Sequence, residues 1–249
     1  MRKRIKLTVA YDGTAYCGWQ IQPNGITIEE VLNRTLTDFL GEEIRVIGAS
    51  RTDSGVHARG NVAVFDTESR IPSDRLSYAL NTQLPEDIRI MRSEEVDPDF
   101  HPRYRDSVKT YEYHIDNGRF PDPVRRLYTH FVPAKLDTEA MRKAAAWLVG
   151  THDFASFCAS GSQAKTTVRT VREINIFSES DEVLIQAKGE GFLYNMVRII
   201  AGTLIKVGLG VYPPDHVKEI LEAKDRGKAG ETAPAKGLLL KNIEYEKID

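Results

Sequence analysis

The chain has 249 residues, a length that fits one large domain or two of about 100–150 residues. Hydrophobic residues make up 41% and charged residues 28%, and no apolar run approaches the roughly 18 residues of a membrane span. We therefore expect a cytoplasmic protein without a membrane partner. The net charge of −2 excludes a generally basic coat for nucleic acid, so any such contact must come from local clusters of basic residues.

The first half of the chain predicts the element order βαββαβ. Alternating apolar residues predict a strand over 4–11. The clearest helix covers 27–40, with Thr27 and Glu30 as a capping box and Gly41 as its stop. The other expected elements are strands over 44–49, 61–66 and 88–92 and a helix over 73–81 capped by Ser73.

The second half repeats this order. The pattern predicts a strand over 108–115, a helix from its cap Asp137 to 149, a hairpin of 167–177 and 182–189, a helix over 194–207, a short helix opened by Pro214 and a last strand over 238–245. Two such units predict an α+β fold with two ferredoxin-like halves, 1–104 and 105–249.

The low cysteine content and the absence of several common motifs argue against several kinds of site. The two cysteines, Cys17 and Cys158, lie far apart in the sequence and form no CxxC pair, so neither a zinc site nor a disulfide is expected. The sequence contains no P-loop, Gly-x-Ser-x-Gly or kinase signature. The Gly-x-Gly at 189–191 lacks the third glycine of a dinucleotide loop, because Tyr194 stands there.

The run 49–60 is the richest in chemistry. It combines one acid, three hydroxyls, an imidazole, two arginines and two glycines between apolar strand-like segments. A lone Asp53 could close an Asx turn. Because Arg51 and Arg59 flank it and glycines permit close approach of a ligand, we favour a loop that holds a polyanion and acts on it through Asp53. An ionised carboxylate in such a place needs a nearby cation.

Arg198 is a candidate for that cation. It follows the strand-to-helix segment that begins at Gly189 and lies among apolar helix positions. Such an arginine either extends to solvent or pairs with a buried carboxylate, and the spacing leaves both alternatives open.

Aromatic and basic residues in the second half are compatible with RNA binding. Tyr111 and Tyr113 share one face of a strand, where they form core packing or stack on a nucleobase. Basic residues gather around the same elements: Arg103, Arg105, Arg119, Arg125, Arg126, Lys165, Arg169 and Arg172.

Several motifs together resemble the tRNA pseudouridine synthase A (TruA) family over nearly the whole chain. The most specific is Arg51-Thr52-Asp53-Ser54-Gly55-Val56-His57-Ala58. The supporting segments are Tyr11-Asp12-Gly13-Thr14, Gly18-Trp19-Gln20, Leu84-Pro85, Phe100-His101, Tyr111-Glu112-Tyr113, Gly150-Thr151-His152-Asp153-Phe154 and the run from Gly191 to Arg198.

The resemblance implies two related halves joined through a central antiparallel sheet, with an RNA cleft between them. It implies isomerisation of uridine to pseudouridine at positions 38, 39 and 40 in the anticodon stem-loop of tRNA, by a homodimer. It assigns Asp53 as the catalytic residue, Tyr111 as the residue that stacks on the target base, Arg198 as the partner of Asp53 and Arg51 as a helper in flipping the nucleotide. Since nothing is oxidised and no group is acquired, no cofactor or metal is expected.

Two other classes of function remain open on the sequence alone. A non-catalytic RNA-binding protein can also be built from βαββαβ units, although no Lys/Arg-Gly-Phe-Gly-Phe-type strand is present. A nucleosidase or glycoside hydrolase could use Asp53, but such enzymes usually need a second carboxylate, and none stands out.

Overall fold

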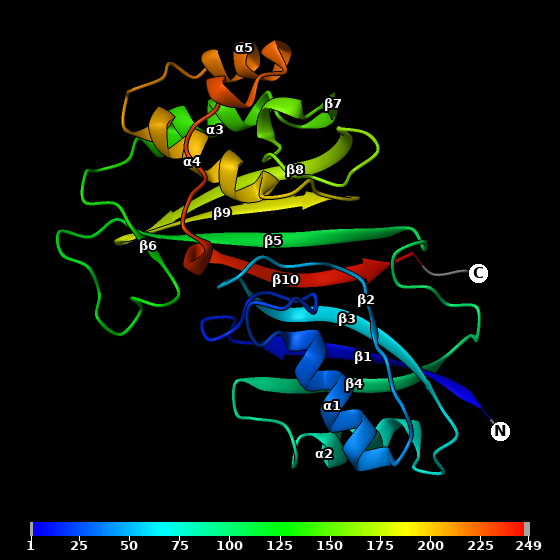
Figure 1. Cartoon of the computed structure of the whole chain (residues 1–249). Helices are drawn as coiled ribbons and strands as arrows, with labels where there is room; N and C mark the ends of the chain where they lie inside the picture. Colours follow the sequence, from blue (N-terminus) through cyan, green and yellow to red (C-terminus); the bar gives the residue numbers. More distant parts are fainter. Residues whose placement is uncertain (1, 247–249) are drawn as a thin grey trace. The chain divides into compact units, whose positions relative to one another are not determined.

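The computed structural model describes residues 2–246, which divide into two compact units (Figure 1). The N-terminal unit comprises Met1–Ser107 with Leu240–Asp249, and the C-terminal unit comprises Val108–Leu239. The sequence-based division into 1–104 and 105–249 grouped the end of the chain with the second half. The compact units instead group the chain from Leu240 onward with the first.

The N-terminal unit has the ferredoxin-like arrangement that its element order predicts. Its strands follow the order β4-β1-β3, and both β2 and β10 pair with β3. The pairings of β1 with β3, β1 with β4 and β2 with β3 are antiparallel. Helices α1 and α2 lie on one face of this sheet (Figure 1). The elements are β1 (Lys3–Tyr11), α1 (Ile28–Leu40), β2 (Ile47–Gly48), β3 (His57–Thr67), α2 (Leu76–Leu80), β4 (Ile88–Val96) and β10 (Leu238–Tyr245).

Helix α1 forms as predicted, because its cap, its apolar stripe and its stop agree. The Thr27 side chain accepts a hydrogen bond from the Glu30 N–H at 3.3 Å, and Gly41 ends the helix in the left-handed conformation at φ 68°. The apolar positions on one side of the helix are buried against the sheet: Ile28, Val31, Leu32 and Leu36.

Two predicted elements of this unit are wrong in extent or capping. The strand expected over 44–49 shrinks to Ile47–Gly48, because the N–H groups of Ile44 and Val46 donate to side chains of α1 instead of to a strand. Ser73 caps no helix: a short 3₁₀ segment, Ser73–Arg75, precedes α2, and the Ser73 hydroxyl donates to Glu95 at 3.3 Å. Strand β3 also begins four residues before the predicted start, at His57.

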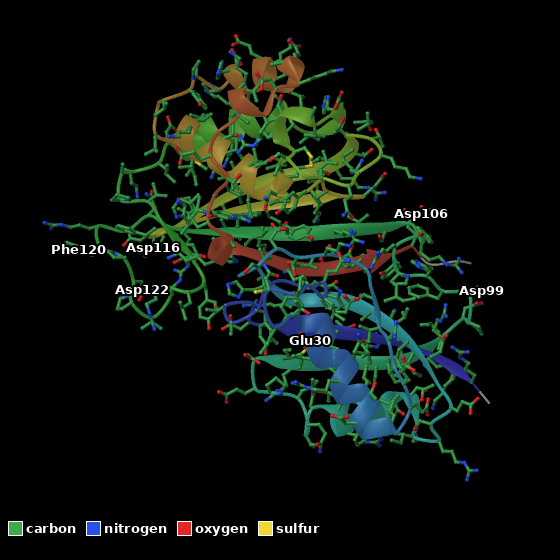
Figure 2. All side chains as sticks on the ribbon, in the orientation of Figure 1. Glu30, Asp99, Asp106, Asp116, Phe120 and Asp122 are labelled. Carbon is green, nitrogen blue, oxygen red and sulfur yellow. The ribbon has the colours of Figure 1, made fainter. Side chains whose placement is uncertain are left out.

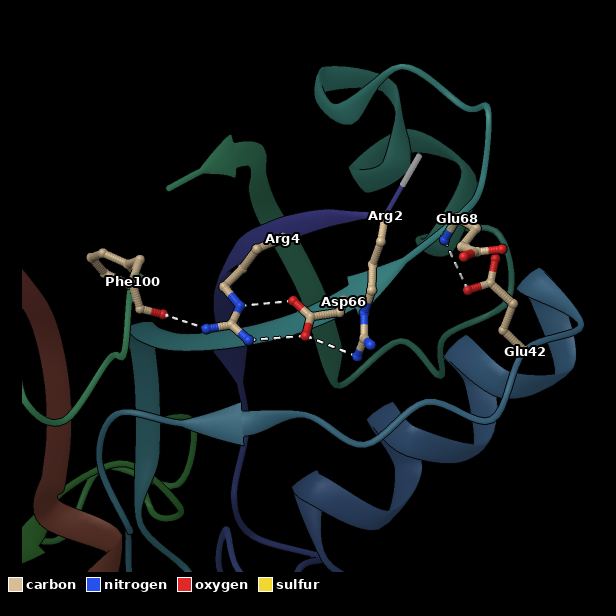
Figure 3. Close-up of polar contacts among 6 residues, drawn as sticks. All are labelled: Arg2, Arg4, Glu42, Asp66, Glu68 and Phe100. Atoms are coloured by element: carbon tan, nitrogen blue, oxygen red, sulfur yellow. Dashed lines mark hydrogen bonds and ion pairs between the residues drawn. The ribbon is translucent and has the colours of Figure 1, made fainter. Parts of the chain in front are cut away.

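Ion pairs fasten the start of β1 to β3 (Figure 3). Arg4 holds the Asp66 carboxylate with two hydrogen bonds of 2.7 and 2.9 Å, and Arg2 adds a third of 3.1 Å. Arg4 also donates to the Phe100 carbonyl at 3.1 Å. The Arg4 guanidinium, and to a lesser extent Arg2, lowers the pKa of Asp66 below its usual value.

The C-terminal unit is a second mixed layer of sheet and helices. Its strands follow the order β5-β9-β8-β7, all antiparallel, and the short β6 runs parallel to β5. Helices α3, α4 and α5 lie on one side of the sheet (Figure 1). The elements are β5 (Ser107–Asp116), β6 (His130–Phe131), α3 (Thr138–Ala146), β7 (Gly150–Asp153), β8 (Val168–Glu179), β9 (Glu182–Gly189), α4 (Met196–Gly208) and α5 (His216–Ala223).

The helices of this unit are shorter than predicted. Asp137 caps α3 as expected, accepting from the Ala140 N–H at 2.9 Å, but the helix ends at Ala146. Helix α4 begins at Met196 because Asn195, in the left-handed conformation at φ 60°, interrupts the helical path before it. Strands β6 and β7 were not predicted, since runs of two and four residues carry too little pattern.

A long connection between β5 and β6 carries exposed apolar side chains, among them Phe120 and Val124. The start of this connection is held by Asp116, whose carboxylate accepts from the backbone N–H groups of Gly118 at 3.2 Å and Asp122 at 2.8 Å. Figure 2 labels Asp116, Phe120 and Asp122 in this region. The mainly antiparallel sheet strands and the helices of the two units confirm the predicted α+β class. Over residues 2–246 no helix has the length and apolar character needed to cross a bilayer, and no cluster of three or more metal-ligating side chains occurs.

Candidate active site

The Asp53 loop (residues 50–56) connects β2 to β3 in the N-terminal unit. Asp53 is half-buried, while Arg51 and Ser54 are exposed. The loop turns tightly, because the Val56 N–H donates to the Asp53 carbonyl at 3.1 Å and Gly55 takes the left-handed conformation at φ 77°. Arg51 and Asp53 therefore both lie on this tight turn.

A buried polar network supports the loop from below. The Tyr11 hydroxyl and the Thr52 hydroxyl are 2.7 Å apart. Asn61 of β3 donates from its amide nitrogen to the Tyr11 hydroxyl at 3.2 Å and to the Ser50 carbonyl at 3.0 Å. Tyr11, Thr52 and Asn61 are all buried, so these hydrogen bonds are protected from water and fix the backbone on both sides of Arg51.

The segment Tyr16–Trp19 holds the loop from the other side. The Trp19 N–H donates to the Thr52 carbonyl at 3.0 Å, and the Gly55 N–H donates to the Tyr16 carbonyl at 3.4 Å. Gly18 has φ 82°, and a Cβ there would lie 2.6 Å from the Thr52 carbonyl oxygen, so only glycine permits this close approach. The same segment accepts hydrogen bonds from the first residues of α1, which ties the Asp53 loop to that helix.

The end of the loop is held by the turn after β1. The Gly13 N–H lies 3.1 Å from Nδ1 of His57. This His57 nitrogen is also 3.1 Å from a carboxylate oxygen of Asp12. A Cβ at Gly13 would lie 2.0 Å from the Val56 carbonyl oxygen. Backbone contacts at the end of the loop therefore leave it little freedom to move relative to β1 and β3.

Tyr111 lies on β5 in the C-terminal unit and is 7% exposed. Its ring meets the edge of Phe192 at a centroid distance of 5.3 Å and an interplanar angle of 83°. Phe192 belongs to the segment between β9 and α4. Tyr111 is therefore held by aromatic packing rather than left on an open sheet face.

Arg198 lies in the first turn of α4 and is half-buried. Its Nε donates to the Ala233 carbonyl at 2.8 Å, and its Nη1 donates to the Asn195 side chain at 2.8 Å. Burial raises the pKa of the nearby Tyr113 hydroxyl, and the positive charge of Arg198 opposes that rise. The Arg198 side chain is thus held along the helix start by these two hydrogen bonds.

Within the N-terminal unit the structure brings Arg51 and Asp53 into one rigid loop, and within the C-terminal unit it fixes Tyr111 and Arg198 on a strand and a helix start. Their catalytic roles stay predictions. The sequence analysis missed the supporting network of Tyr11, Thr52 and Asn61. It also missed Phe192, although Tyr11, Thr52 and Phe192 lie inside the motifs that carried the resemblance, whereas Asn61 lies outside them.

Comparison with known proteins identifies the family. A family model described as tRNA pseudouridine synthase matches residues 7–105 and 144–246. A tRNA pseudouridine synthase A from Acetivibrio thermocellus is 50% identical over 243 residues, covering 98% of this chain and 100% of the relative. Proteins of the same name from Brevibacillus brevis and Exiguobacterium sp. are 48% and 47% identical, covering 98% and 99% of this chain and 100% of each relative.

The chain belongs to the tRNA pseudouridine synthase family. The resemblance seen in the sequence is therefore confirmed, and as a member of this family the chain is an isomerase. The match covers the Asp53 loop, and it also covers the segment from β9 into α4. The matched residues of this pseudouridine synthase therefore include Arg51, Asp53 and Arg198.

Proposed function

We propose that the protein converts uridine to pseudouridine at positions 38, 39 and 40 in the anticodon stem-loop of tRNA. The observation that supports this most is the Asp53 loop, a half-buried carboxylate on a turn fixed from three sides, in a chain of the tRNA pseudouridine synthase family. A carboxylate that must meet one atom of a flipped nucleotide needs such a fixed position.

The reaction breaks the bond between N1 of uracil and C1′ of ribose and forms a bond between C5 and C1′. In the proposed mechanism Asp53 either attacks C1′ or removes a proton to form a glycal, and both routes use its ionised form. Tyr111 stacks on the uracil while it rotates, because stacking tolerates rotation of the ring in its own plane. The reaction neither gains nor loses atoms, so the proposal includes no cofactor or metal.

The two arginines have separate proposed roles. Arg51 is exposed and lies two residues before Asp53, a place from which it can hold the flipped nucleotide. Arg198 pairs with Asp53 in this proposal, and its hydrogen bonds to Ala233 and Asn195, which hold the side chain in place, are compatible with such a role. We further propose that the enzyme acts as a homodimer, which light scattering of the purified protein tests directly.

A hydrolytic reaction is the alternative in which Asp53 releases the base. Unmodified tRNA transcript carrying label in its uracil rings is incubated with the full-length protein and no added cofactor. Pseudouridine that stays in the RNA, with no free uracil, supports the proposal. Free uracil and abasic RNA would indicate a nucleosidase, and binding without either product would indicate a non-catalytic RNA-binding protein.

A further inference from the structure

Arg169 lies in β8 beside the segment that leads from β9 into α4. The Thr170 carbonyl accepts a hydrogen bond from the Glu190 N–H at 3.1 Å, so this part of β8 runs along that segment. The Arg169 side chain crosses Gly191: a Cβ on this glycine would lie 3.8 Å from both Cδ and Nε of the arginine. The arginine is thereby placed next to the backbone of Gly191.

Arg169 is a half-buried cation with only neutral partners. Its Nη1 donates to the carbonyls of Thr166 at 2.9 Å and Val168 at 2.6 Å. Among residues 2–246 no carboxylate lies within ion-pair distance of it, and Nε and Nη2 donate to no acceptor there. Burial lowers the pKa of this arginine, with the Cys158 thiol acting in the opposite direction.

Two other arginines of the same unit, unlike Arg169, have a carboxylate partner. Arg172, three residues further along β8, contacts the Glu190 carboxylate at 3.0 Å. Arg142 of α3 pairs with Glu139 and donates to the Ile176 carbonyl at 3.0 Å. Since a charge removed from water is costly without a counter-charge, Arg169 is the arginine of this group that an external anion would stabilise most.

The place of Arg169 indicates which anion it meets. Phe192 follows Gly191 directly, and its ring contacts Tyr111. A nucleotide whose base stacks at Tyr111 would bring its backbone close to this segment. The planar guanidinium, with Nε and Nη2 on one edge, matches two oxygens of a phosphate group.

We propose that Arg169 binds a backbone phosphate of the tRNA next to the nucleotide held at Tyr111. This proposal rests on the proposed function, since it takes the RNA to approach Tyr111. Arg169 is then a substrate-binding residue and not a catalytic one. The competing interpretation is structural: through its two carbonyl hydrogen bonds Arg169 would only fasten the turn at 166–168.

Binding of an unmodified tRNA transcript to the full-length protein tests this over a series of salt concentrations. Arg169→Gln is expected to weaken binding about tenfold at low salt. It is also expected to reduce the slope of log affinity against log salt by about 0.7–0.9, the loss of one phosphate contact. Arg169→Lys should keep the slope and lose part of the affinity. Arg142→Gln, which removes a carboxylate-paired arginine, is the matched control and should behave as wild type.

A phosphate scan then identifies the contact. Anticodon stem-loops, each with one neutral methylphosphonate linkage, are titrated with wild type and Arg169→Gln. One linkage should weaken binding to wild type and have no further effect on the variant. Wild-type affinity and salt slope in Arg169→Gln would overturn the proposal and leave the structural role. Failure of the wild-type protein to bind tRNA or to form pseudouridine would contradict the proposed function instead.

Discussion

The two units position their candidate functional side chains by different means. In the N-terminal unit the Asp53 loop is irregular, and backbone hydrogen bonds from Trp19 and Gly55 together with buried hydroxyls hold it. In the C-terminal unit Tyr111 lies on a regular strand and Arg198 at a helix start, and these side chains are held by a ring edge and by carbonyl oxygens. Loss of a neutral hydroxyl should therefore impair the Asp53 loop of the N-terminal unit. Loss of a positive charge should instead impair the candidate site residues of the C-terminal unit.

Asp53→Asn should produce the largest effect. The amide keeps the shape of the loop but can neither attack nor accept a proton, so single-turnover pseudouridine formation should fall by roughly 10² to 10⁴ or more. Affinity for tRNA and the melting temperature should stay near those of wild type, because the backbone bonds of the loop are retained. A rate within tenfold of wild type would remove Asp53 from its role.

Arg198 variants test whether the C-terminal site acts through charge geometry. If Arg198 pairs with Asp53 as proposed, Arg198→Ala should lose catalysis at neutral pH, and the acidic limb of its rate profile should move to higher pH, because Asp53 would lose its cation. Arg198→Lys should recover little, since a point charge lacks the two-pronged guanidinium. Single-turnover rates against pH decide the matter, and near-wild-type profiles for both variants would exclude the pairing.

Thr52 variants test whether a neutral hydroxyl positions the Asp53 loop. Thr52→Val keeps the shape but leaves the buried Tyr11 hydroxyl without this partner, so the rate should fall about tenfold at saturating tRNA with little change in affinity. Thr52→Ser retains the oxygen and should restore most of the rate.

Thr67→Val is the matched control for this experiment. It removes a buried hydroxyl from the other end of β3, where Thr67 donates to Glu42 at 3.0 Å. Its stability should fall by about 1–3 kcal/mol, as for Thr52→Val, without loss of rate. A Thr52→Val enzyme that is less stable but equally fast would show that the network serves the fold alone.

Asp66 gives the smallest effect and concerns the N-terminal unit alone. Because Arg4 lowers its pKa in the folded protein, its contribution to stability is present above the unfolded value near 3.9 and is lost as pH falls through the folded value. Asp66→Asn should reduce stability by less than about 1 kcal/mol at neutral pH, since the pair is partly solvated. In denaturant titrations the difference from wild type should shrink as the pH falls below the unfolded value, and a constant difference at all pH values would contradict this.

The sequence alone predicted the parts of the fold that local rules determine. The cap at Thr27, the stop at Gly41 and the hairpin of β8 and β9 depend on neighbouring residues, and these predictions are confirmed. The expected strand over 44–49 was shortened by α1 side chains, which take N–H groups that a sheet would otherwise use. These hydrogen bonds depend on how α1 packs against the segment, and the hydrophobic pattern of the sequence gives no sign of them.

The same limit applies to the candidate site. The types and spacing of residues in 49–60 pointed to Asp53 and Arg51, because an acid between arginines is uncommon in a simple turn. The support from Asn61 and Gly18 depends on contacts between segments far apart in the chain. The isolation of Arg169 likewise depends on which carboxylates reach it, which the count of arginines in the sequence does not reveal.

Position-resolved mapping of pseudouridine tests the central claim most directly. Unmodified tRNA transcripts are incubated with wild type and with Asp53→Asn in the absence of any cofactor, and each uridine is then examined. We expect pseudouridine at positions 38, 39 and 40 with wild type and none with the variant. Modification confined to other positions, or equal modification by both proteins, would contradict it.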